Sequence, residues 1–173
     1  MAQSYKNKKD IAIESRLDSV DSLLTWVETC WSDSSPPNQD GWPLLKAQAL
    51  TGIVELFTNS VRHAHRDLDP APPIVLIWTS DRQGFSICIH DHGQPFAPEQ
   101  MFGDLRLMTA QGGADPNERD LHWGLLILLR LCDDHGWLLR TIRSATGINT
   151  VTLEHAWPSL PNHTESLRLP STR

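Results

Sequence analysis

The stretch that decides the fold is residues 49–63, which read ALTGIVELFTNSVRH. Its apolar side chains recur at the spacing of one helix face: Leu50, Val54, Phe57 and Val61. Glu55, Asn59 and His63 also fall four residues apart, and at about 100° per residue they point away from the apolar face. The pattern predicts a helix whose polar face presents a carboxylate, an amide and an imidazole. A plain solvated face would look the same, so residues further along the chain must distinguish the two interpretations.

The second informative stretch is residues 85–93, FSICIHDHG. Apolar and polar residues alternate with a period of two, which predicts a strand with one face on a core. The strand runs into Asp91 and Gly93, so a carboxylate lies at its end and a glycine allows close approach of the backbone to a ligand. Such an ending is also typical of an ordinary turn.

The third stretch is residues 121–134, LHWGLLILLRLCDD. Its glycine-bearing start and apolar continuation predict a buried helix beginning at Gly124. The free N–H groups and the dipole of a helix N-terminus can hold phosphate.

In this order and spacing, the three stretches resemble the ATP-binding modules of the superfamily that includes gyrase, sensor histidine kinases and mismatch-repair ATPases. The chain looks most like the small bacterial anti-sigma-factor serine/threonine kinases. The family's Glu-x-x-x-Asn-x-x-x-His box matches Glu55, Asn59 and His63, and its Asp-x-Gly box matches Asp91 and Gly93. The later motifs match more loosely, at Gly124 with Leu125 and at Thr150 with its neighbours. The resemblance covers residues 10–156.

This resemblance implies that ATP and Mg²⁺ bind here. Asn59 would offer an amide oxygen to Mg²⁺, which prefers oxygen ligands, and Glu55 would accept the proton of an attacking hydroxyl. Asp91 would accept the adenine amino group, with Gly93 beside the base. His63 would either reach the phosphates or only pack.

Two further positions complete the expected nucleotide site. Gly124 and Leu125 would begin the phosphate-facing helix, and Thr150 would make a water-mediated adenine contact. The family usually has Gly-x-Gly where this chain has His122-Trp123-Gly124. A side chain at His122 disfavours positive φ and so hinders lid closure, unless the imidazole itself contacts phosphate.

The resemblance implies a partner-switching regulator that holds a sigma factor and phosphorylates a small antagonist protein, with a homodimer as an option. A switch that regulates its partner by binding alone is the alternative, and His122 favours it. A detached catalytic domain of a sensor histidine kinase is less favoured, because no hairpin with a phospho-acceptor histidine is visible.

Composition narrows the remaining classes. The 173 residues suit one domain, and a net charge of −6 does not favour nucleic-acid binding. No apolar run reaches the ~18 residues of a membrane span. Three widely spaced cysteines suit reduced thiols in the cytoplasm. The pairs His63 with His65 and His90 with His92 suggest zinc, but no four-ligand set can be identified.

The predicted fold class is α+β: a two-layer sandwich with a mixed, largely antiparallel sheet covered on one face by helices. Residues 10–156 would form the domain, between a mobile segment 1–9 and a polar tail 157–173. Strands are expected at residues 10–16, 74–78, 85–91, 137–143 and 149–155. Helices are expected from residue 18 or 19 to 31 and from residue 42 onward. Residues 93–120 would be a lid, mostly loop, with a short helix near 98–102.

Overall fold

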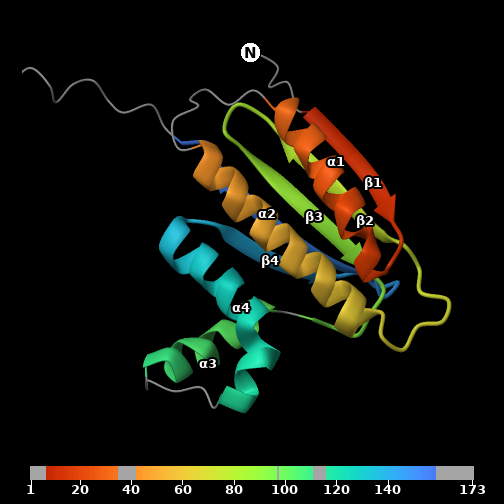
Figure 1. The fold of residues 1–173 in the computed structure, drawn as a ribbon, viewed down its shortest axis with the longest axis vertical. Helices are drawn as coiled ribbons and strands as arrows, with labels where there is room; N and C mark the ends of the chain where they lie inside the picture. Colours follow the sequence, from red (N-terminus) through yellow and green to blue (C-terminus); the bar gives the residue numbers. More distant parts are fainter. Residues whose placement is uncertain (1–6, 35–41, 97, 111–115, 159–173) are drawn as a thin grey trace, which may run out of the picture.

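The computed structural model describes residues 7–34, 42–96, 98–110 and 116–158, with the backbone alone at Glu99 and residues 116–122. The described residues form an open five-stranded sheet with α-helices on one face (Figure 1). The predicted α+β sandwich is therefore confirmed. One detail differs, because every pairing between the described strands is antiparallel rather than mixed.

The strands are β1 (Asn7–Ile13), β2 (Ile74–Ser80), β3 (Gly84–Asp91), β4 (Leu138–Arg143) and β5 (Asn149–Ala156). Their order in the sheet is β1-β2-β3-β5-β4. The α-helices are α1 (Val20–Ser32), α2 (Trp42–Asn59), α3 (Pro98–Ala110) and α4 (Pro116–His135). A 3₁₀ turn, η1 (Leu17–Ser19), precedes α1, and a π-helical turn, η2 (Ser60–Ala64), continues α2.

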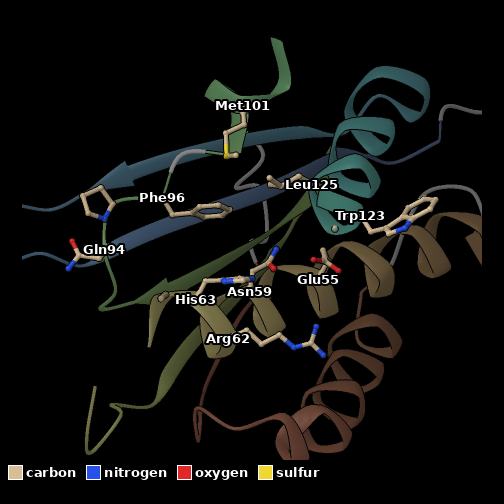
Figure 2. A pocket seen from close by; sticks show the side chains of 12 residues that line it. Glu55, Asn59, Arg62, His63, Gln94, Phe96, Met101, Trp123 and Leu125 are labelled. Atoms are coloured by element: carbon tan, nitrogen blue, oxygen red, sulfur yellow. The ribbon is translucent and has the colours of Figure 1, made fainter. Parts of the chain in front are cut away.

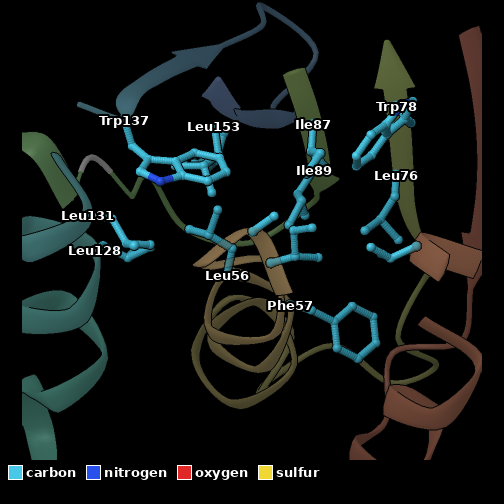
Figure 3. Close-up of a cluster of buried hydrophobic side chains, with 14 of the residues drawn as sticks. Leu56, Phe57, Leu76, Trp78, Ile87, Ile89, Leu128, Leu131, Trp137 and Leu153 are labelled. Carbon is cyan, nitrogen blue, oxygen red and sulfur yellow. The ribbon is translucent and has the colours of Figure 1, made fainter. Parts of the chain in front are cut away.

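The core lies between the sheet and the helices, and the period-two pattern of the strands selects its members (Figure 3). In β2 and β3 the buried residues alternate with half-exposed ones, so that every second side chain points toward the helices. Gln48 on α2 accepts a hydrogen bond of 3.1 Å from the indole of Trp137, which ties that buried ring to the helix layer. This apolar layer holds α2 and α4 at fixed positions over the sheet.

The region 93–120, expected to be mostly loop, contains all of α3 and the first turn of α4. α3 continues through Ala110 instead of ending near residue 102, because Phe102 and Leu105 are buried against the rest of the domain. α4 begins at Pro116, so Gly124 lies inside the helix and not at its N-terminus. The expectation of free phosphate-binding N–H groups at Gly124 is therefore wrong for this structure.

The ends of the domain also differ from the expected boundaries. The first strand spans Asn7–Ile13, so residues 7–9 belong to the sheet rather than to a mobile segment. Trp157, assigned to the tail, is buried and donates a 2.7 Å hydrogen bond to the Asp81 carbonyl. Residues 1–6 and 159–173 lie outside the described part. Within that part, no helix has the length and apolar content needed to cross a membrane.

Candidate nucleotide site

A cavity of about 480 Å³ lies between α2, the segment after β3, and helices α3 and α4 (Figure 2). The residues that line it are Glu55, Asn59, Arg62, His63, Ala64, Gln94, Pro95, Phe96, Met101, Trp123, Gly124 and Leu125. One wall is thus rich in charged and amide groups, and the opposite wall is largely apolar.

The polar wall is the face of α2 and η2 that carries Glu55, Asn59 and His63. These side chains line the same cavity, as their spacing predicts. The other face of α2 is anchored in the core by Ile53 and Phe57, both fully buried. After Asn59 the helix widens into the π-turn, and the His65 N–H donates to the Ser60 carbonyl at 2.9 Å. The core therefore fixes which side chains face the cavity.

Glu55 packs closely against α4. A Cβ atom placed on Gly124 would lie 1.5 Å from Glu55 Oε1, so only a glycine leaves room for this carboxylate. The structure thus gives Gly124 a different role from the predicted phosphate contact: it allows Glu55 to lie against the α4 backbone. Leu125, the next residue, is buried and forms part of the cavity wall.

Asp91, the last residue of β3, binds the backbone of the loop that follows the strand. Asp91 is 2% exposed, and its Oδ1 accepts a 3.0 Å hydrogen bond from the Gly93 N–H. Its Oδ2 accepts a 3.0 Å bond from the Ser60 hydroxyl. Gly93 packs so tightly on η2 that a Cβ there would lie 2.4 Å from the Ala64 Cα. Asp91 and Gly93 therefore lie just behind the residues that line the cavity.

The start of β5 contacts this loop through Asn149 and not through Thr150. Asn149 is fully buried, and its Nδ2 donates a 2.8 Å hydrogen bond to Asp91 Oδ1. Thr150 pairs with His90 in the register, and both are half-exposed on the sheet face that carries no helix. The predicted adenine contact of Thr150 is wrong for this reason. The alternation of side chains along a strand would have predicted the role of Asn149, because Asn149, Val151 and Leu153 share one face.

Behind the loop, His65 joins two segments. Its Nε2 accepts a 3.0 Å hydrogen bond from the His92 N–H, so its Nδ1 carries the proton and donates to Ser15 Oγ at 2.8 Å. Burial lowers the pKa of His65 below its ordinary value, although the nearby Asp91 carboxylate acts in the opposite direction. His65 is therefore a neutral structural group of the site.

Several cavity residues were not predicted as site residues. Arg62 lines the polar wall beside His63, and Phe96 and Met101 reach the cavity from the other side. The arginine could have been found because it is next to His63 in the motif, whereas Phe96 and Met101 depend on the path of the chain after β3. The His122 backbone lies within α4, and its side chain is outside the described residues.

The side chains that line the cavity suit Mg²⁺ and a nucleoside triphosphate. Glu55 and Asn59 bring oxygen atoms to one wall, one helical turn apart, and Mg²⁺ is bound by such oxygen ligands together with phosphates. Arg62 and His63 can donate hydrogen bonds to phosphate oxygens. Phe96 and Met101 offer an apolar surface for a base. Among the described residues, no group of three or more His, Cys, Asp or Glu side chains could hold a metal ion by itself.

The profile of the histidine kinase-like ATPase domain family matches residues 13–154. The chain belongs to this family, and it is an ATP-binding domain of that type. A comparison with curated proteins finds no match.

Proposed function

We propose that the protein is a Mg²⁺-dependent serine/threonine protein kinase that acts in the cytoplasm as a partner-switching regulator. It would hold a sigma factor and phosphorylate a small antagonist protein, and it would do so as a monomer or a homodimer. The observation that carries the proposal is the shared cavity wall of Glu55 and Asn59, a carboxylate and an amide one turn apart on α2.

In this proposal the γ-phosphoryl group of ATP is transferred to the substrate hydroxyl, and the bond to the β,γ-bridging oxygen breaks so that ADP leaves. Asn59 would hold Mg²⁺, and Arg62 with His63 would hold phosphate oxygens. Glu55 would orient the substrate Ser or Thr hydroxyl and accept its proton. The close packing of Glu55 on Gly124 of α4 supports this role, because it restricts the directions in which the carboxylate can point when it binds the hydroxyl.

The proposal is tested by transfer of labelled γ-phosphate to the antagonist, which is first identified by pull-down from the source cells and mass spectrometry. Glu55→Gln should retain ATP affinity within about twofold and lose at least ~100-fold of the transfer rate, because a general base contributes roughly 10²–10⁴-fold. Glu28→Gln is the matched control, since Glu28 lies on α1 and pairs with Lys46 at 2.5 Å. Transfer by Glu55→Gln at the wild-type rate would remove Glu55 from catalysis.

Asn59→Ala tests the metal site separately. We expect weaker ATP binding in the presence of Mg²⁺ and little change in its absence, because the amide oxygen is proposed as a magnesium ligand. Calorimetry with and without Mg²⁺ measures this difference. Equal loss of affinity under both conditions would argue that Asn59 contacts the nucleotide directly.

A non-catalytic binding switch is the second candidate. It is favoured by the helical backbone of residues 122–124, where the related enzymes usually have a glycine-rich approach to the helix. Nucleotide-dependent partner binding with no label transfer to any antagonist would establish this alternative.

A further inference from the structure

Among the described residues, three donors surround the Asp91 carboxylate and leave it one open acceptor position. A carboxylate offers about four lone-pair sites. The Gly93 N–H and the Asn149 amide occupy Oδ1, and the Ser60 hydroxyl occupies one site of Oδ2. Only Oδ2 therefore keeps a position for a further donor, so the orientation of the carboxylate decides where that position points.

The Asn149 amide is itself held in one orientation. Its Nδ2 donates to Asp91 Oδ1 at 2.8 Å and to the Gln94 carbonyl at 2.9 Å. Its Oδ1 accepts a 2.6 Å hydrogen bond from Arg143 Nη1, which also donates to the Gly93 carbonyl at 2.8 Å. A flipped amide would place two acceptors together at Asp91 and two donors together at Arg143. Arg143 thus acts together with these two acceptors to keep the Asn149 donors directed at the loop.

The position of the loop does not depend on Asn149 alone. Gly93 is wedged against Ala64, and the His92 N–H is bound by His65. These contacts hold the backbone from the η2 side, where Asn149 does not reach. Asn149 also holds this loop, through the Gly93 and Gln94 carbonyls at 3.4 and 2.9 Å. Its effect on the direction of the Asp91 carboxylate is therefore measured by base selectivity and not by affinity alone.

We propose that Asn149, held by Arg143, is a positioning residue that aims the open acceptor of Asp91 at the 6-amino group of adenine and so sets the base selectivity of the site. This inference rests on the proposed function, in which ATP binds in the cavity, and adds that the base reaches Asp91 just behind the cavity lining. Inosine triphosphate carries a carbonyl in place of that amino group and cannot donate there. The ratio of ATP to ITP affinity therefore reports the aim of the carboxylate.

The test measures the dissociation constants of ATP and ITP by calorimetry for the full chain and its variants. Asn149→Ala should reduce the ATP preference about tenfold, the size of one hydrogen bond to a charged group. Release of the Gly93 and Gln94 carbonyls would weaken ATP and ITP alike, and such a common loss leaves the ratio unchanged. Arg143→Gln should reduce it less, and Arg143→Lys should restore part of it, because a lysine can still donate to Asn149 Oδ1. The controls are Thr150→Ala, on the opposite sheet face, and Arg140→Gln, which loses only the pair with Glu154.

A merely structural role predicts a different result. If Asn149→Ala weakens ATP and ITP by the same factor, or leaves the ATP preference intact, the inference is wrong. Arg143 is exposed, so Arg143→Gln decides the question if Asn149→Ala fails to fold. A wild type that binds both nucleotides equally would refute the adenine contact of Asp91 and the inference with it. A wild type that prefers ATP while both variants keep that preference would refute the inference alone.

Discussion

Strand β3 connects two regions of opposite character. At its start, Phe85 lies in an aromatic cluster with Trp78, Trp157 and Trp31, at ring-centroid distances of 4.9, 4.8 and 5.2 Å. At its end, Asp91 lies in a network of hydroxyl, amide and backbone donors. Both regions are buried and both face the helix layer, yet one is built from rings and the other from hydrogen bonds.

The difference separates stability from function. Aromatic pairs add roughly 0.5–1.5 kcal/mol each beyond the burial of their apolar area. A buried hydrogen bond contributes roughly 0.5–1.5 kcal/mol net, because it replaces a bond to water, and the cost of burying a carboxylate offsets much of that gain. The aromatic cluster therefore stabilises the domain, whereas the polar network mainly fixes a carboxylate beside the cavity. Substitutions at the two ends should accordingly change different observables.

The largest expected effect on stability is at the aromatic end. Trp78 is fully buried, and its indole N–H donates a 3.2 Å hydrogen bond to Ser34 Oγ. Trp78→Ala should lower the free energy of unfolding by about 3–5 kcal/mol, since a large cavity forms in the core. Urea denaturation followed by circular dichroism measures this change, and ATP affinity of the folded protein should stay within about twofold. Leu44→Ala, at a residue 63% exposed, is the control and should change stability by less than ~0.5 kcal/mol.

A Trp78→Ala variant of normal stability would show that the cluster does not carry the fold. A folded variant with much weaker ATP binding would show that the two ends of β3 are coupled.

The aromatic and apolar parts of the fold were the most predictable from sequence. Strands β2 and β3, and β5 as far as Leu153, bury every second residue, and this alternation is visible in the sequence. α3 was predicted too short, because its few apolar residues, among them Phe102 and Leu105, lie in a region rich in Gly, Pro and Asp, which favour loops. Their burial comes from packing rather than from the local pattern. The start of α4 was misplaced for a similar reason, since an isolated glycine was interpreted as a helix boundary.

The polar end was only partly predictable. The spacing of Glu55, Asn59 and His63 is a local property of one helix, so the sequence places them on one face. Asp91 contacts residues that are 31 and 58 positions away in the chain. Inspection of one sequence does not reveal which distant donors meet a carboxylate. No sequence pattern marked Arg143 as a residue of the site, because its role depends on the path of the loop 50 residues earlier.

A second prediction concerns the contact between Glu55 and α4. Gly124→Ala would place a methyl group on the Glu55 carboxylate, and the flexible carboxylate would have to move. We expect phosphoryl transfer to fall about 10–100-fold, since displacement of a catalytic group by ~1 Å has effects of this size. Stability should change by less than ~1.5 kcal/mol, because alanine also favours the helix by roughly 1 kcal/mol over glycine. Transfer rates and urea denaturation of the same preparations test both statements.

Gly103→Ala on α3 is the matched control. A Cβ at Gly103 meets nothing within 4 Å, so this variant should gain the helix preference of alanine and keep its transfer rate. If Gly124→Ala transfers phosphate as fast as Gly103→Ala, the position of Glu55 against α4 is unimportant for the chemistry.

The smallest expected effect is a pH dependence that arises at the polar end. Burial lowers the pKa of His65, so the unfolded chain takes up a proton near pH ~6.5 while the folded protein resists protonation until lower pH. The unfolded state then binds more protons in this range, and the free energy of unfolding falls as the pH falls. The contribution of neutral His65 is fully present above pH ~6.5 and is lost as the pH falls through the lowered pKa of the folded state. Protonation also removes the acceptor at Nε2, to which the His92 N–H donates.

Denaturation curves recorded at even steps from about pH 7.5 to about pH 5 should therefore show a shallower loss of stability in His65→Gln than in the wild type. Burial also lowers the pKa of His90, which lies on the sheet face opposite the helices. His90→Gln should therefore also reduce the loss of stability with falling pH. Of these two contributions, that of His65 involves a hydrogen bond to the Asp91 loop, so the protection of the His92 amide, its exchange rate relative to the intrinsic rate, should fall with acid in the wild type and in His90→Gln. Two results would show that His65 is not the acid-sensitive contact at this end of β3. One is a His65→Gln variant whose stability falls with pH as steeply as that of the wild type. The other is a His92 amide whose exchange, corrected for intrinsic rates, is equal at both ends of this pH range.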